Sequence, residues 1–361
     1  MKSPRTIKPL TASLWLGLTL ATVPLAHAAD QGVAYVSNQD GGVTVVDLAT
    51  MKVKSEIAVG AGAGSPRGLG VTDDGKLLIT ANRDGGNISV IDTTTGKVIK
   101  LIPIGKNPEF VRVVGDKAYI SYEPSSKGGP PPKLGAKPVE EEDDDDEGAE
   151  EPARISIVDL KQGKVVQEIV SGPETEGIEF SKDGKKLIVT NEADNTVTVH
   201  DLKTGKLLKT IDTHKYGDRP RGIKIAPDGN SYIATLEFGN KFLVLDGNFN
   251  PVKTVDTGAS PYGVSFDKSG KRIFVAASKA QQLQVFDAKT YKKIKDIPTG
   301  KRCWHFTFTP DDKQILLACG KSDELMVIDA EKLQVTGSVG DKKMPWGVVT
   351  YPKTMGSLDK P

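Results

Sequence analysis

A short apolar strand pattern that ends in aspartate occurs seven times along this chain. Successive aspartates are 45, 67, 42, 45, 41 and 42 residues apart. A period of about 40 to 50 residues built from short strands is typical of propeller blades. The repeat therefore predicts an all-β fold, a seven-bladed β-propeller. The seven strands end at Asp47, Asp92, Asp159, Asp201, Asp246, Asp287 and Asp329.

Each repeat contains four predicted strands joined by tight turns. In the repeat that begins at Pro66, strands are expected over residues 66–71, 77–80, 87–92 and 97–102. Gly75 supplies the positive φ that the first hairpin turn requires. Asp92, like its six counterparts, is expected to cap backbone amides in the turn that follows it.

The two ends of the chain each supply part of one repeat. Residues 33–59 provide three strands, and residues 345–349 provide an inner strand with no strand after it. We predict that these parts form the first blade together, with three N-terminal strands and one C-terminal strand. Such closure removes exposed sheet edges. The predicted propeller spans residues 29–352, and residues 353–361 follow it as a C-terminal tail.

The chain begins with a targeting pattern. Basic residues up to Lys8 precede an apolar run over residues 10–25 and the sequence Ala26-His27-Ala28. This is typical of a signal peptide over residues 1–28, cleaved near Ala28. The apolar run is shorter than the roughly 20 residues that span a bilayer. We expect a periplasmic or secreted protein with no membrane span, and a monomer.

Three strings resemble the YVTN repeat: residues 34–38 (AYVSN), 78–82 (LITAN) and 187–191 (LIVTN). Each precedes an apolar strand that ends in aspartate. The resemblance covers nearly all of the chain after the signal peptide and indicates the YncE-like group of exported seven-bladed propellers. That group is related in fold to lactonase-like propellers and to the haem d1 domain of nitrite reductases. Because such a fold supports binding, scaffolding and catalysis, the resemblance alone does not choose an activity.

One interval is longer than the others because of an insertion at residues 124–153. This segment is rich in proline and contains ten carboxylates between Glu140 and Glu151. Its composition predicts a disordered acidic loop. Weak capture of divalent cations and docking to a basic partner, or to the propeller itself, are the alternatives. Without the signal peptide the chain has a net charge of −2, the insertion has −7 and the remainder has +5.

The residue between Pro and Gly of each inner strand, or its equivalent, should line one mouth of the central channel. Two cations, two carboxylates and three aromatic residues occupy this position, a composition that suits a ligand site. Alternatively, the aromatic residues plug the channel and the arginines pair with the glutamates. His305 is expected at the same mouth. The predicted ligand-binding residues are Arg67, Glu109, Glu176, Arg221, Tyr262, Trp304, His305 and Trp346.

The repeat that begins at Cys303 departs most from the pattern. Its hairpin should bring Cys303 close to Cys319, the other cysteine of the chain. In an oxidising compartment such a pair favours a disulfide, worth about 3 kcal/mol in the chain-entropy model. A soft-metal site formed by Cys303, His305 and Cys319, with Met344 as a further ligand, is an alternative, as are free or redox-active thiols.

The sequence favours a binding or interaction protein over an enzyme, with a small ligand or a periplasmic protein as partner. It contains no C-x-x-C-H, H-E-x-x-H or G-x-S-x-G motif, and no cofactor is expected. A lactonase-like hydrolase is one alternative, with Glu109, Glu176 and His305 as its candidate groups. Binding of single-stranded nucleic acid, with aromatic residues as stacking platforms, is another.

Overall fold

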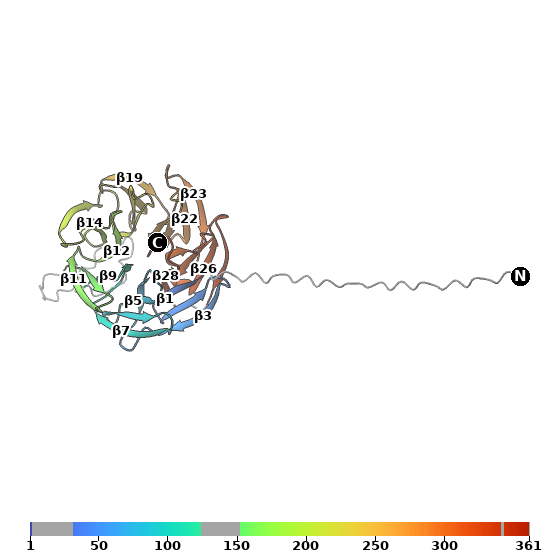
Figure 1. Cartoon of the computed structure of the whole chain (residues 1–361). Helices are drawn as coiled ribbons and strands as arrows, with labels where there is room; N and C mark the ends of the chain where they lie inside the picture. Colours follow the sequence, from blue (N-terminus) through green and yellow to red (C-terminus); the bar gives the residue numbers. More distant parts are fainter. Residues whose placement is uncertain (2–31, 124–151, 341–342, 361) are drawn as a thin grey trace.

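A computed structural model describes residue 1 and residues 32–123, 152–340 and 343–360. The predicted signal peptide and acidic loop lie outside the described residues, apart from residue 1 and residues 152–153. Within the described ranges the strands form seven antiparallel four-stranded sheets arranged in a ring (Figure 1). The predicted seven-bladed propeller is therefore confirmed.

Each blade is one sheet, numbered here in chain order and given from its inner to its outer strand. Blade 1 contains β28 (Pro345–Tyr351), β1 (Val33–Asn38), β2 (Val43–Asp47) and β3 (Lys52–Ile57). Blade 2 contains β4 (Pro66–Val71), β5 (Leu77–Asn82), β6 (Asn87–Asp92) and β7 (Lys97–Pro103). Blade 3 contains β8 (Val111–Val114), β9 (Lys117–Tyr122), β10 (Arg154–Asp159) and β11 (Lys164–Val170). Blade 4 contains β12 (Thr175–Phe180), β13 (Lys186–Asn191), β14 (Thr196–Asp201) and β15 (Leu207–Asp212).

The last three blades have the same plan. Blade 5 contains β16 (Pro220–Ile225), β17 (Ser231–Leu236), β18 (Lys241–Asp246) and β19 (Pro251–Asp256). Blade 6 contains β20 (Pro261–Phe266), β21 (Arg272–Ala277), β22 (Gln282–Asp287) and β23 (Lys293–Pro298). Blade 7 contains β24 (Cys303–Phe308), β25 (Gln314–Cys319), β26 (Glu324–Asp329) and β27 (Gln334–Val339), with a short 3-10 helix, η1 (Gly320–Ser322), after β25.

Blade 1 closes the ring as predicted. Strand β28 pairs with β1 in antiparallel register, with Tyr35 opposite Val349. This pairing joins the C-terminal strand to the N-terminal strands of blade 1 through backbone hydrogen bonds and so closes the ring.

The aspartate at the end of each third strand caps the turn that follows. Asp201 Oδ1, for example, accepts hydrogen bonds from the Thr204 backbone nitrogen at 2.8 Å and from its hydroxyl at 2.7 Å. These bonds hold the pKa of Asp201 below its ordinary value. The other six aspartates cap their turns in the same way, which explains why the repeat ends in this residue.

Burial falls from the axis outward. All six residues of β12 and of β24 are buried, because inner strands are covered by neighbouring blades on both faces. Most residues of the outer strand β3 are exposed. The core therefore lies between the blades, where Phe242 and Phe286, for example, pack edge to face with ring centroids 5.2 Å apart.

Residues 353–360, predicted as a tail after the propeller, lie inside the ring (Figure 1). The Phe308 nitrogen donates to the Met355 carbonyl at 2.9 Å, Leu358 is 1% exposed, and Lys224 Nζ donates to the Asp359 carbonyl at 2.6 Å. These partners are near the C-terminal ends of inner strands. The segment thus fills the channel away from the ends where the inner strands begin.

In the described part of the chain, no helix has the length and apolar character needed to cross a membrane.

Candidate functional site

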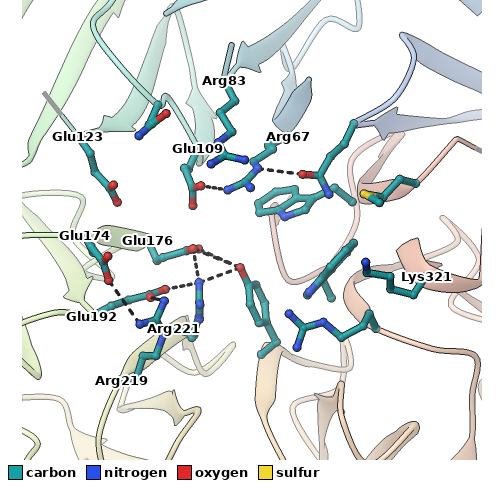
Figure 2. A pocket seen from close by; sticks show the side chains of 17 residues that line it. Arg67, Arg83, Glu109, Glu123, Glu174, Glu176, Glu192, Arg219, Arg221 and Lys321 are labelled. Carbon is teal, nitrogen blue, oxygen red and sulfur yellow. Dashed lines mark hydrogen bonds and ion pairs between the residues drawn. The ribbon is translucent and has the colours of Figure 1, made fainter. Parts of the chain in front are cut away.

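A cavity of about 230 Å³ opens where the inner strands begin, and we call it the mouth (Figure 2). Because the C-terminal segment fills the channel beneath it, the mouth is a cup and not a pore. Its lining residues are Gln39, Met344 and Trp346 of blade 1; Arg67 and Arg83 of blade 2; Asn107, Glu109 and Glu123 of blade 3; Glu174, Glu176 and Glu192 of blade 4; Arg219 and Arg221 of blade 5; Tyr262 of blade 6; and Arg302, Trp304 and Lys321 of blade 7.

The structure brings seven of the eight predicted mouth residues to this cavity; His305 is the exception. The His305 ring is buried beneath the mouth, 4.3 Å from the Trp346 ring, and its Nδ1 is 3.1 Å from the Ser357 hydroxyl of the C-terminal segment. Burial lowers the pKa of His305 to about 3, so the imidazole is neutral at physiological pH. His305 therefore supports the floor of the mouth and does not face its contents.

The sequence did not predict a second circle of mouth residues. In each blade this residue lies two positions before the inner-strand residue that was predicted to line the mouth. This position has a left-handed backbone in all seven blades, with φ between 48° and 63° and no glycine among its residues. Such a conformation is unfavourable for most side chains, and here it turns five of the seven into the mouth. The seven residues are Ser65, Asn107, Glu174, Arg219, Ser260, Arg302 and Met344, of which the two serines do not line the cavity.

A third group enters from the loop after the second strand in blades 1, 2, 3, 4 and 7, as Glu192 follows β13. The spacing from the inner-strand residue could have revealed both groups, but their residue types vary from blade to blade and share no motif.

The arginines of blades 2 and 5 pair with glutamates of their neighbours. Arg67 pairs with Glu109, and Arg221 pairs with both Glu176 and Glu192. Arg219 Nη2 is 2.7 Å from a Glu192 oxygen. The predicted pairing of arginines with glutamates is thus present on these blades.

Burial and charge set the protonation of this network. Burial raises the pKa of Glu192 well above its ordinary value, and the nearby carboxylates of Glu176 and Glu237 act in the same direction. Burial also opposes ionisation of Glu176, but the Arg221 guanidinium holds its pKa below the ordinary value. The Arg221 side chain also donates to the Tyr262 hydroxyl at 3.0 Å. The network therefore has a fixed ion pair, Arg221 with Glu176, and one carboxyl that resists ionisation.

Blade 7 differs in the two cations that it contributes to the mouth. Arg302 and Lys321 form no ion pair with any described residue. The Arg302 guanidinium lies 5.8 Å from the centroid of the Trp304 ring. Trp304 lies against Gly320, where a Cβ would be only 2.0 Å from Trp304 Cζ3.

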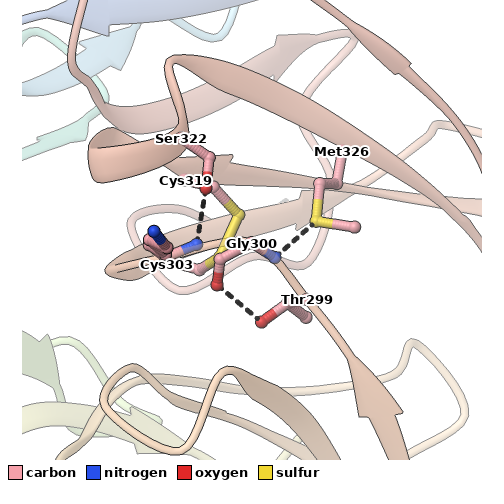
Figure 3. The surroundings of a disulfide bond; sticks show 7 residues. Thr299, Gly300, Cys303, Cys319, Ser322 and Met326 are labelled. Atoms are coloured by element: carbon pink, nitrogen blue, oxygen red, sulfur yellow. Dashed lines mark hydrogen bonds between the residues drawn. A yellow bond between two sulfur atoms is a disulfide. The ribbon is translucent and has the colours of Figure 1, made fainter.

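The predicted disulfide between Cys303 and Cys319 is confirmed, and it joins β24 to β25 next to the mouth (Figure 3). Its two half-cystines are the chain neighbours of Arg302 and Trp304 on one side and of Gly320 on the other. The bond therefore fixes the segments that carry the blade 7 cations. It also uses both sulfurs that the soft-metal alternative requires. Among the described residues, no group of three or more His, Cys, Asp or Glu residues could hold a metal ion.

Together, the fold and the site define a seven-bladed propeller with a filled channel and a charged, blind mouth. The sequence profile of the family described as Cytochrome D1 heme domain matches residues 19–115 and 150–282, more than half of the chain. The chain belongs to this family.

Individual relatives agree with this assignment. Protein NirF of Pseudomonas aeruginosa is 23% identical over 319 residues, which cover 76% of this chain and 79% of NirF. Protein YncE of Salmonella typhimurium is 26% identical over 212 residues, 56% of this chain and half of YncE. The resemblance to the YncE-like group is thus confirmed. The solved structure of the periplasmic gluconolactonase PpgL of Pseudomonas aeruginosa is similar in fold, with a TM-score of 0.68 and 16% identity over 88% of this chain and 98% of PpgL.

The family name implies a haem, but the mouth does not fit one. No histidine is among the described residues that line it, and Met344 is its only sulfur-bearing side chain. His305 is buried against Trp346, and Tyr262 is engaged by Arg221. The cavity of about 230 Å³ is also below the roughly 300–1,000 Å³ of typical ligand pockets. Neither the donor set nor the size suits an iron tetrapyrrole.

Proposed function

We propose that this protein is an exported binding propeller that holds a small organic anion in the mouth of its channel. The observation that carries the proposal is the pair Arg302 and Lys321, which have no ion pair among the described residues while the other ion pairs of the mouth link arginines to glutamates. Unpaired cations in a concave site attract an anionic ligand, and a charge-assisted hydrogen bond is stronger than a neutral one.

The lining supports a small and polar ligand. Trp304, Trp346 and Tyr262 line the cavity, but they are 7%, 2% and 6% exposed, so they offer edges and not broad faces. A cavity of this volume holds roughly a handful of waters, at about 30 Å³ of liquid volume each. A carboxylate or phosphate ester of low molecular mass would fill it.

The two alternatives, a lactonase-like hydrolase and binding of single-stranded nucleic acid, have less support. A lactonase-like hydrolase needs a base that can take a proton, but Glu109 and Glu176 are held by arginines and His305 is buried beneath the mouth. Stacking of nucleic-acid bases needs exposed ring faces, which the three buried aromatic side chains do not provide.

Export through a signal peptide over residues 1–28 is part of the proposal, with a propeller that starts at residue 29. The basic start, the apolar run and the Ala26-His27-Ala28 site support it. Mass measurement of protein recovered from the periplasm tests this part, because a chain that retains residues 1–28 would contradict it.

The binding proposal is tested by titration calorimetry with butyrate, glutarate and inorganic phosphate as probes. The double variant Arg302→Gln/Lys321→Gln should lower the affinity for the probe that binds best by about ten-fold or more, because two charge-assisted contacts are lost. The double variant Lys203→Gln/Lys289→Gln is the control, since it removes the same charge from exposed turns of other blades. Equal loss in both variants, or no binding of any probe by the unmodified protein, would refute the proposal.

A further inference from the structure

The charges of the mouth are segregated by blade. Blades 3 and 4 contribute only carboxylates among their charged lining residues, and blades 2, 5 and 7 contribute only cations. The arginines of blades 2 and 5 are next to the acidic blades in the ring, and Arg67 and Arg221 pair with glutamates across those blade boundaries.

Blade 7 cannot make such pairs because of its position. In a closed ring of seven, it is three steps from blade 3 in one direction and three steps from blade 4 in the other. Figure 2 shows Lys321 on the side of the mouth away from Glu123, Glu174 and Glu192. The mouth therefore has an acidic side and a basic side that face each other across the cavity.

The acidic side carries more carboxylates than its neighbouring arginines neutralise. Arg219 and Arg221 together contact Glu174, Glu176, Glu192 and Glu237. Because burial keeps Glu192 protonated, three carboxylates remain for two guanidinium groups.

The most exposed of these carboxylates is Glu174. Its side chain is 38% exposed, whereas the side chain of Glu176 is 6% exposed and that of Glu192 is 2% exposed. A ligand in the cavity therefore reaches Glu174 first, and this carboxylate suits a cationic donor that enters from the cavity.

From this arrangement we infer that the ligand is dipolar, a small amino acid whose carboxylate meets Arg302 and Lys321 and whose ammonium meets Glu174. The inference rests on the proposed function and adds the second charge. Because the two sides face each other across the cavity, the ammonium and the carboxylate should be separated by several bonds. This favours ω-amino acids over α-amino acids, in which the charges are adjacent.

Titration calorimetry with two matched series tests the inference. The first series runs from glycine through 4-aminobutyrate to 6-aminohexanoate, and the second contains the carboxylates that lack the amine, such as butyrate. We expect one ω-amino acid to bind about ten-fold more tightly than its amine-free counterpart, since it adds a charge-assisted hydrogen bond. Glu174→Gln should reduce this preference to less than about three-fold, whereas Glu331→Gln, on an exposed turn of blade 7, should leave it intact.

The possible failures are distinguishable. If the amine-free carboxylates bind as tightly as the amino acids and Arg302→Gln/Lys321→Gln weakens both, the dipolar inference is wrong and the proposed anion site stands. If no carboxylate of either series binds, and phosphate does not bind either, both are wrong. If butylamine alone binds as tightly as 4-aminobutyrate, the mouth is a cation site and both are again wrong.

Discussion

Replacement of Gly320 by alanine should disturb the basic side of the mouth more than its single added methyl suggests. The new Cβ would lie 2.0 Å from Trp304 Cζ3 and 2.5 Å from Cη2. Non-bonded carbons prefer about 3.5–4.0 Å, so the indole or the backbone must move by about 1.5 Å. The backbone has little freedom, because the disulfide at Cys319 holds the preceding residue to β24.

The expected cost follows from this overlap. Adding a methyl to a filled site costs typically about 1–3 kcal/mol, and Gly320 lacks the positive φ that would strain alanine independently. Urea unfolding should therefore show a loss of about 1–3 kcal/mol in the free energy of unfolding. The emission of Trp304 should also change, because the ring moves toward the cavity.

Gly337→Ala is the matched control. Gly337 lies on β27 of the same blade, and nothing is within 4 Å of the position of its Cβ. An alanine there should be neutral or stabilise by up to about 1 kcal/mol, through the unfolded state. Ordinary surface changes alter the free energy of unfolding by up to about 0.5 kcal/mol. If the free energies of unfolding of the two variants differ by no more than this, the packing of Trp304 on Gly320 is refuted.

Three further predictions concern the disulfide, the buried carboxyl of Glu192 and the C-terminal segment in the channel. The double variant Cys303→Ala/Cys319→Ala should lose about 3 kcal/mol in urea unfolding, because it removes the constraint on the unfolded chain; equal stability of the oxidised protein and the variant would contradict this. Glu192→Gln should gain stability relative to the unmodified protein as the pH rises above about 4.5, the ordinary value for glutamate. Above this pH Glu192 ionises in the unfolded chain, while burial keeps its carboxyl protonated in the folded protein. The unmodified protein therefore loses stability as the pH rises from the ordinary pKa toward the raised pKa, and the glutamine variant does not. A difference in unfolding free energy between the two proteins that stays constant from pH 4 to pH 8 would contradict this prediction. Leu358→Ala should cost about 2–5 kcal/mol, the range for a buried leucine, and an unchanged urea midpoint would mean that the C-terminal segment does not lie in the ring.

Much of the site was predictable because a propeller repeats its geometry. Once the phase of the repeat is known, the residue at one position of every inner strand must face the same mouth, and Arg67 and Trp346 lie there although they are 279 positions apart. The same register places Cys303 opposite Cys319. The left-handed residues such as Glu174 are also at a fixed spacing in the repeat, but no residue type marks their φ angle, so the sequence does not show that they turn into the mouth.

The sequence by itself determined the number of blades, the closure of blade 1 and the proximity of Cys303 to Cys319, since all three follow from local periodicity and strand register. The structure then showed that the two cysteines form a disulfide. Only the tertiary structure decided what surrounds the mouth. The pairing of Arg221 with glutamates of blade 4 depends on which blades are neighbours. Arg302 forms no ion pair with a described residue because its blade is far from the acidic blades. Residues 353–360 have no strand pattern, and they enter the ring because the channel offers apolar surface and buried partners such as Lys224 that no single repeat encodes.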